Sequence, residues 1–163
     1  MDMASTFIVP LLVALTTALV TSLVALRNFR RERMWDLKVE TYDSIFAALY
    51  DFYEFFRKQV QSEVFDDLDE EELEAEKESY NEASYYLGSI LFTGEFIIHP
   101  KAVKELEELN RNLQLKEPGF LENLLPGHKR YKFYIAQKSL VSESTDRLRI
   151  IAKKDLKAKW ASS

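Results

Sequence analysis

Residues 35–60, "WDLKVETYDSIFAALYDFYEFFRKQV", carry the pattern that decides the fold. Apolar side chains recur in this stretch at spacings that alternate between four and three residues, which is the heptad pattern of a helix packed along its length on other helices. The seam consists of Trp35, Val39, Tyr42, Phe46, Leu49, Tyr53, Phe56 and Val60. Ile45 and Phe52 widen this stripe, so the pattern predicts contact with more than one neighbour, as in a helical bundle.

Upstream of the seam, residues 7–26, "FIVPLLVALTTALVTSLVAL", contain no charged side chain. An apolar run of about 20 residues matches the hydrocarbon core of a bilayer, roughly 30 Å thick, and predicts a transmembrane helix. A cleaved signal peptide is the alternative, and it requires basic residues before the apolar run. The preceding residues, "MDMAST", contain Asp2 and neither Lys nor Arg, which favours a membrane anchor.

The positive charges of this region all follow the apolar run, at Arg27, Arg30, Arg31 and Arg33. By the positive-inside rule this flank stays in the cytoplasm, so residues 1–6 face outward and residues 27–163 are cytoplasmic. The predicted location is the cell inner membrane, crossed once. The four arginines are expected to contact anionic lipid headgroups, at about 1 kcal/mol each. Neither Gly nor Pro interrupts residues 27–60, so the helix is expected to continue out of the membrane.

Small side chains occupy one side of the predicted transmembrane helix. At 100° per residue they fall within an arc of roughly 140° and form two interleaved small-xxx-small series. The members of this small-residue face are Ala14, Thr17, Ala18, Thr21, Ser22 and Ala25. Small residues allow helices to approach closely in lipid, so the face predicts a homo-oligomer, with its hydroxyls either packed between helices or lining a narrow polar pore. Chance segregation is the alternative, because GxxxG is absent.

Downstream of the seam the sequence predicts three more helices. An acidic run at residues 62–78 forms a solvated helix start or a linker, and an apolar pattern then extends to Ile90. Gly94 predicts a helix end and Pro100 a helix start. "LKEPGFLENLLPGHKR", residues 115–130, reads as a loop before a last helix at residues 131–159. The expected fold is all-α, a transmembrane helix followed by a cytoplasmic bundle of about four helices.

Residue patterns that would indicate a reaction are absent from the sequence. Cysteine is missing, and neither histidine lies in a metal-binding motif such as E-x-x-H. His99 is expected to cap the helix that follows it, and His128 to lie in the Pro-Gly loop. Four scattered glycines form no phosphate-binding loop, and no serine lies in a nucleophile elbow. We therefore expect no enzymatic activity, no cofactor or metal and no small-molecule substrate.

The C-terminal helix is basic, with ten Lys and Arg against three acids from Lys129 onward. Its late charges are candidates for contact with RNA or with anionic lipid. These residues are Arg147, Arg149, Lys153, Lys154 and Lys157. The alternative interpretation is a favourable interaction of cations with the C-terminal end of the helix dipole.

Three segments carry a resemblance: "RRERMWDLKVETYDSIFAAL" at 30–49, "GEFIIHPKAVKELEEL" at 94–109 and "IAKKDL" at 151–156. Together with the single span, they resemble small bacterial membrane proteins with a cytoplasmic helical domain. Within that set the chain is similar to the type VI-B CRISPR accessory membrane protein, a HEPN-like family. The resemblance implies assembly in the membrane and a pore or depolarising activity in antiphage defence, triggered by a nucleic-acid-sensing partner. The R-x4-6-H pair of active HEPN ribonucleases has no match here, since neither His99 nor His128 follows an arginine at that spacing.

Three hypotheses follow for the function. The first is a non-enzymatic membrane protein that homo-oligomerises and forms a pore or depolarises the membrane during defence. The second is a passive anchor or scaffold that recruits a cytoplasmic partner through the bundle. The third is an RNA-binding, degenerate HEPN-like domain. The expected partners are membrane lipid, further copies of this chain, and a defence-system protein or RNA.

Overall fold

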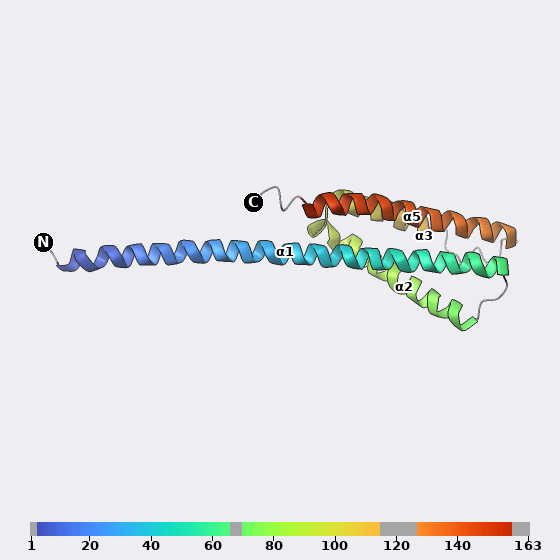
Figure 1. Cartoon of the computed structure of the whole chain (residues 1–163), viewed down its shortest axis with the longest axis horizontal. Helices are drawn as coiled ribbons and strands as arrows, with labels where there is room; N and C mark the ends of the chain where they lie inside the picture. The colour runs from blue at the N-terminus through green and yellow to red at the C-terminus, as the bar shows by residue number, and fades with distance from the viewer. Residues whose placement is uncertain (1–2, 66–69, 115–126, 158–163) are drawn as a thin grey trace. The chain divides into compact units, whose positions relative to one another are not determined.

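The computed structural model describes residues 3–65, 70–114 and 127–157, and in these ranges it is all-helical, without a strand (Figure 1). Its elements are α1 (Met3–Phe65), α2 (Glu70–Thr93), the 3-10 turn η1 (Gly94–Phe96), α3 (Pro100–Gln114) and α5 (Gly127–Lys157). The predicted all-α class is therefore confirmed. The chain divides into two compact units between Leu37 and Lys38.

The described part of the first unit is the N-terminal portion of α1. From Leu11 to Met34 every side chain is exposed, including nine large aliphatic residues between Leu11 and Leu26. Among the described helices α1 alone is long and apolar enough to cross a membrane, judged by length and composition. The expected long apolar helix at the N-terminus is thus present.

The second unit packs α1 from Lys38 onward, α2, α3 and α5 around one shared core. The side chains with the lowest exposure come from all four helices: Tyr42, Ile45, Leu49, Phe56, Leu87, Leu106, Leu109, Val141 and Leu148. Phe52, Phe55 and Phe56 of α1 surround Tyr80 of α2, with ring centroids 4.9, 4.6 and 5.8 Å from the tyrosine ring. Aromatic rings at such separations attract one another beyond their burial, so this cluster fastens α2 to α1.

The turn between α2 and α3 follows the sequence prediction, because α2 ends before Gly94 and α3 begins at Pro100. The amides of Ile97 and Ile98 both donate to the Gly94 carbonyl oxygen at 2.9 Å. A Cβ atom at Gly94 would lie 3.4 Å from the Ile90 side chain, so the absence of a side chain permits this close approach. Six residues therefore connect the end of α2 to the start of α3.

The start of α5 corrects the sequence analysis. The helix begins at Gly127, so the predicted loop is wrong for its last four residues, and His128 lies in a helix and not in a loop. The physical reason is a tertiary contact that no local pattern reveals: Arg130 Nε lies 2.8 Å from Glu63 Oε1 of α1. The rest of that predicted loop, residues 115–126, and the predicted helix end beyond Lys157 lie outside the described residues.

Candidate functional site

The small-residue face of α1 is exposed along its whole length in the single chain. Two of its hydroxyls are satisfied within the helix. Thr17 Oγ1 donates to the Val13 carbonyl oxygen and Thr21 Oγ1 to the Thr17 carbonyl oxygen, both at 2.8 Å. Such backbonding uses the hydroxyl proton and leaves the oxygen able to accept. At these two positions the face therefore carries no unsatisfied donor. An apolar surface, or one with few hydrogen-bond acceptors, can pack against it without leaving a hydroxyl proton unpaired.

The arginines that follow the apolar segment are all exposed: Arg27, Arg30, Arg31 and Arg33. A guanidinium on a long, partly apolar side chain reaches headgroup phosphates from a helix that stands in lipid. Their exposure leaves all four available for that contact.

From Val39 onward the heptad seam lies on the inner side of α1 in the second unit, whereas Trp35 belongs to the first unit. Tyr42, Leu49 and Phe56 are buried, whereas the other members, Trp35, Val39, Phe46, Tyr53 and Val60, are half-buried. Ala48 and Phe55 are also buried, although neither belongs to the predicted seam. The predicted stripe, widened by Ile45 and Phe52, is still narrower than the buried face, because α1 contacts α2 through Lys58 and α5 through Glu63. The adjacent pair Phe55 and Phe56 was the signal for a wider buried face, since neighbouring helical residues point in different directions.

One polar cluster, centred on Asp155, was not anticipated. Asp155 Oδ1 lies 2.9 Å from Lys38 Nζ, and Asp155 Oδ2 accepts from the Tyr42 hydroxyl at 2.9 Å and from the His99 amide at 3.1 Å. Three segments meet at this carboxylate: the first turn of α1 in the second unit, the residue before α3, and the last turns of α5. His99 Nδ1 in turn accepts from the Lys101 amide at 3.1 Å, so His99 caps α3 as predicted.

The Asp155 cluster holds Tyr42 in its protonated form. Burial raises the pKa of the Tyr42 phenol far above its ordinary value, and the hydrogen bond to the Asp155 carboxylate raises it further. Tyr42 therefore remains a hydrogen-bond donor across the physiological pH range. In the sequence, Asp155 was only one of three acids in a basic stretch, and nothing local marks it as the point where three helices join.

The basic residues of α5 have two different roles. Arg147 Nε lies 2.7 Å from Glu105 Oε1 of α3, and Arg149 Nη1 lies 3.0 Å from Asp146 Oδ1 within α5. Lys153, Lys154 and Lys157 are exposed and make no ion pair within the residues that the structure describes. The two arginines thus serve the second unit itself, and the three lysines remain candidates for an external anion.

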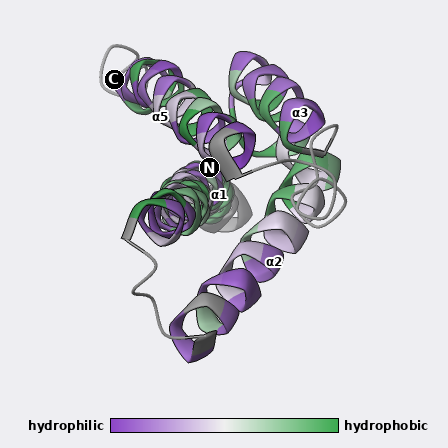
Figure 2. Cartoon of the chain, turned by 90° about the vertical axis from the view of Figure 1, so that its right-hand side faces the viewer, coloured by the Kyte–Doolittle hydropathy of each residue, from purple (hydrophilic) through white to green (hydrophobic). Residues whose placement is uncertain are grey.

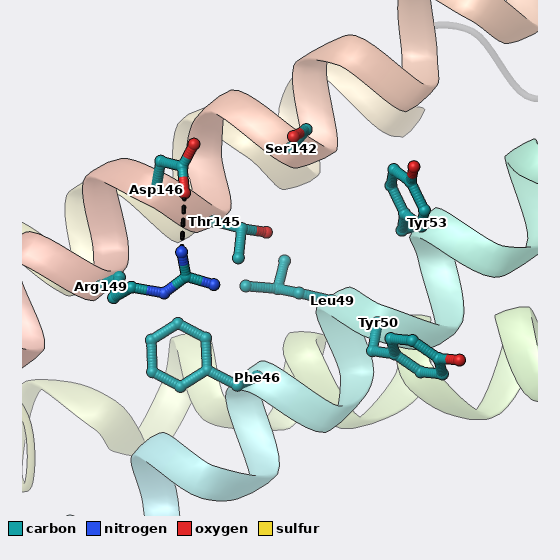
Figure 3. Close-up of a pocket in the computed structure, with 8 residues that line it drawn as sticks. All are labelled: Phe46, Leu49, Tyr50, Tyr53, Ser142, Thr145, Asp146 and Arg149. Carbon is teal, nitrogen blue, oxygen red and sulfur yellow. Dashed lines mark hydrogen bonds and ion pairs between the residues drawn. The ribbon is translucent and has the colours of Figure 1, made fainter.

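A groove of about 480 Å³ runs between α1 and α5 in the second unit (Figure 3). From α1 it is lined by Phe46, Leu49, Tyr50 and Tyr53, and from α5 by Ser142, Thr145, Asp146 and Arg149. Ring faces, hydroxyls and a guanidinium can hold a flat or amphipathic side chain. The groove is lined by neither a histidine nor a carboxylate pair. Across the three described ranges, no group of three metal-ligating side chains occurs.

A second cluster of charges lies between α1 and α2. Lys58 Nζ of α1 lies 2.7 Å from Glu76 Oε1 of α2. Burial raises the pKa of the nearby Asp51 carboxyl, and the negative charges of Glu76 and Glu82 raise it further. The ion pair favours contact between the two helices, whereas the Asp51 carboxylate opposes it at neutral pH.

No family model matches this chain, and neither the curated proteins nor the solved structures give a significant match.

Proposed function

We propose that this chain is a single-span inner-membrane protein whose copies assemble through the small-residue face of α1, and that the assembly alters membrane permeability. The observation that carries the proposal is the exposure of every side chain from Leu11 to Met34 in a helix rich in Leu and Val. Water penalises such a surface by roughly 25 cal/mol for each Å² of apolar area. When the exposed Leu and Val side chains contact lipid in place of water, this free-energy cost disappears.

The small-residue face supports assembly between copies. Within a bilayer, apolar area alone does not drive helices together, and close approach of backbones does. Thr17 and Thr21 donate to their own helix, so a second helix can pack over both without leaving a hydroxyl proton unpaired. Their oxygens keep acceptor capacity, which is the property a narrow water-lined passage requires.

The basic flank supports an orientation with the N-terminus outside and the second unit in the cytoplasm. Four exposed arginines follow the apolar segment directly, and positive residues are retained on the cytoplasmic side. The resemblance of residues 30–49, 94–109 and 151–156 to the type VI-B CRISPR accessory membrane proteins supports antiphage defence as the setting. In that setting a defence-system protein or RNA acts as the trigger, with the lysines of α5 as its contact.

The test compares the full-length chain with Ala18→Leu, which fills the small-residue face, and with Val20→Leu, a control on the opposite side of the helix. Cells that express each chain are loaded with a voltage-sensitive dye, and the detergent-solubilised proteins are sized by light scattering. We expect oligomers and depolarisation for the unmodified chain and for Val20→Leu, and a reduction of both for Ala18→Leu. A strictly monomeric particle from the unmodified chain overturns the proposal.

The groove of Figure 3 favours a second candidate function, a membrane anchor that recruits a cytoplasmic protein. Under this alternative the span is passive and the groove binds the partner. Replacement of residues 7–26 by an unrelated polyleucine span distinguishes the two, because an anchor keeps its function and a self-assembling span loses it.

A further inference from the structure

Helix α2 presents an outward stripe that is acidic in its first half and aromatic in its second. The stripe follows helical spacing through Glu74, Glu78, Tyr85 and Phe92, all exposed. The two rings are 85% and 87% exposed, and Gly88 and Ser89 leave a shallow gap between them. A Cβ atom at Gly88 would meet nothing within 4 Å, so the gap is open to an incoming side chain. Exposed rings that flank a gap are typical of a docking surface.

Helix α5 presents the complementary stripe. Its outward positions include Lys132, Ile150, Lys153 and Lys157, all exposed, with Ile150 57% exposed. None of the three lysines makes an ion pair within the part of the chain that the structure describes. The acids between them on α5 are already paired with arginines: Asp146 with Arg149, and Glu143 with Arg147 at 3.8 Å. The stripe therefore has a positive character, and Ile150 is its most exposed aliphatic side chain, ahead of Ile135 at 38%.

The two stripes lie on opposite sides of the second unit. Figure 2 shows α2 and α5 at opposite corners of the four-helix arrangement, with α1 and α3 between them. The outward side of α2 and the outward side of α5 therefore face away from each other. Each copy of the chain therefore has the α2 stripe on one side and the α5 stripe on the other. When the α2 stripe of one copy contacts the α5 stripe of a second, the first copy keeps a free α5 stripe and the second a free α2 stripe.

The charged and apolar residues of the two stripes also occur at matching heights along the axis of the second unit. The contacts that each helix makes with α1 give these heights. Near its end, α1 contacts α2 through Lys58 and Glu76 and contacts α5 through Glu63 and Arg130. These contacts set Glu74 near the level of Lys132.

Further along, the same α1 turns meet both helices again. Ala48 lines a hollow with Ala83 of α2, and Leu49 lines the groove with Thr145 of α5. Ile150 accordingly falls between the levels of Tyr85 and Phe92. Glu74 thus lies at the height of Lys132, and Tyr85 and Phe92 lie on either side of the height of Ile150.

We propose that the α2 stripe of one copy docks against the α5 stripe of a second copy, with the helices parallel, so that Tyr85 and Phe92 enclose Ile150 and Glu74 meets Lys132. This inference rests on the proposed function, because copies inserted in one membrane in the same orientation are the ones that meet in parallel. A contact between unlike surfaces is heterologous and closes into a ring when the rotation between copies permits. It supplies a second layer of contact outside the membrane.

Other occupants fit these surfaces less well. Two α2 stripes would bring carboxylates against carboxylates, and two α5 stripes would bring lysines together, both of which are repulsive. An anionic membrane would attract the two rings but would repel Glu74, Glu78 and the neighbouring Glu95. A second copy satisfies the charges and the apolar side chains together.

The test uses the natural lack of cysteine in this chain. Ser89→Cys and Ile150→Cys are introduced into separate full-length chains, which are co-reconstituted in liposomes and mildly oxidised. A disulfide forms only when the Cα atoms approach to within about 7 Å. We expect a disulfide-linked dimer in the mixture and a ladder of larger species from chains that carry both changes. Lys104→Cys, exposed on α3, replaces Ile150→Cys in the matched control and should give no dimer.

Ala18→Cys, in the small-residue face, reports separately on assembly in the membrane. Crosslinking at Ala18→Cys without the Ser89 and Ile150 dimer overturns this inference and leaves the proposed function standing, whereas loss of both overturns both. Dimers from Ser89→Cys chains alone would reveal a contact between like stripes and overturn the inference. Quenching of a fluorophore on Ser89→Cys by spin-labelled lipid would overturn it as well, because the stripe would then face the bilayer.

Discussion

The two units of the chain satisfy their polar groups in opposite ways. In the first, Thr17 and Thr21 bond back to their own helix, and no described side chain from Leu11 to Met34 is buried. In the second, Lys38 reaches Asp155 across 117 residues of sequence and Arg147 reaches Glu105 across 42. The second unit is stabilised by contacts within one copy, whereas the first has its apolar and small faces still unmatched. Changes in the second unit should therefore alter the stability of a single copy, and changes in the first should alter assembly.

The largest effect is expected from the core of the second unit. Phe56 is 1% exposed, and Phe56→Ala should lower the free energy of unfolding of this unit by about 3–5 kcal/mol, since the substitution removes buried area and leaves a cavity. Phe92→Ala is the matched control, because Phe92 is 87% exposed and its loss should leave stability nearly unchanged. Thermal unfolding of the solubilised protein, followed by circular dichroism, measures both. Equal losses for the two variants would contradict the assignment of Phe56 to the core.

A smaller loss is expected at the junction of three segments. Asp155→Asn keeps an acceptor for Tyr42 and His99 but removes the charge opposite Lys38, and it should cost about 2 kcal/mol because a partly buried ammonium loses its partner. Asp146→Asn is the control, since the carboxylate of Asp146 pairs with Arg149 at an exposed position. The same unfolding measurement decides, and an unchanged midpoint for Asp155→Asn would show that the cluster contributes nothing to stability.

The first unit should respond in assembly and not in stability. Ala18→Leu places a large side chain in the small-residue face and should weaken self-association about tenfold, or about 1.4 kcal/mol, with no change in the unfolding of the second unit. Analytical ultracentrifugation in detergent gives the association constant, and Val20→Leu provides the comparison. A drop in unfolding midpoint with Ala18→Leu would break the distinction between the two units.

A weaker effect on assembly is expected from the charged stripes. Glu74→Lys places like charges opposite each other between copies and should reduce the yield of the Ser89 and Ile150 crosslink by a few-fold, which corresponds to about 1 kcal/mol. Lys132→Glu in the same chain reverses the second charge and should restore the yield. Recovery is the informative part, because a merely local disturbance by either substitution would not be relieved by the other.

Local patterns predicted the helices well, and long-range contacts account for what they missed. The seam from Val39 to Val60, the end of α2 before Gly94 and the start of α3 at Pro100 all follow from spacing and backbone preference. The early start of α5 depends on a contact between Arg130 and Glu63, which lie 67 residues apart. A pattern read over one helix length cannot include both Arg130 and Glu63, so it cannot predict their contact.

The candidate sites likewise separate into those that local patterns predict and those that depend on long-range contacts. The small-residue face could be identified from residues 7–26 alone, because a helical wheel needs only neighbouring residues. The Asp155 cluster, the groove between α1 and α5 and the opposed stripes could not, because each requires knowledge of which helices are neighbours and at what register. His99 was predicted correctly because its capping bond reaches only two residues along the chain.

The smallest predicted effect concerns the carboxylate that opposes packing inside the second unit. Burial and the charges of Glu76 and Glu82 raise the pKa of Asp51 in the folded state, so the folded chain binds that proton more tightly than the unfolded chain does. The ionised form therefore costs stability at neutral pH, and the cost disappears as the pH falls below the ordinary range of an aspartate. Asp51→Asn should raise the unfolding midpoint slightly at neutral pH, and this gain should vanish in acid. Asp43→Asn, at an exposed position of the same helix, should show no such dependence. A gain for Asp51→Asn that is the same at both pH values would trace the effect to packing and not to charge.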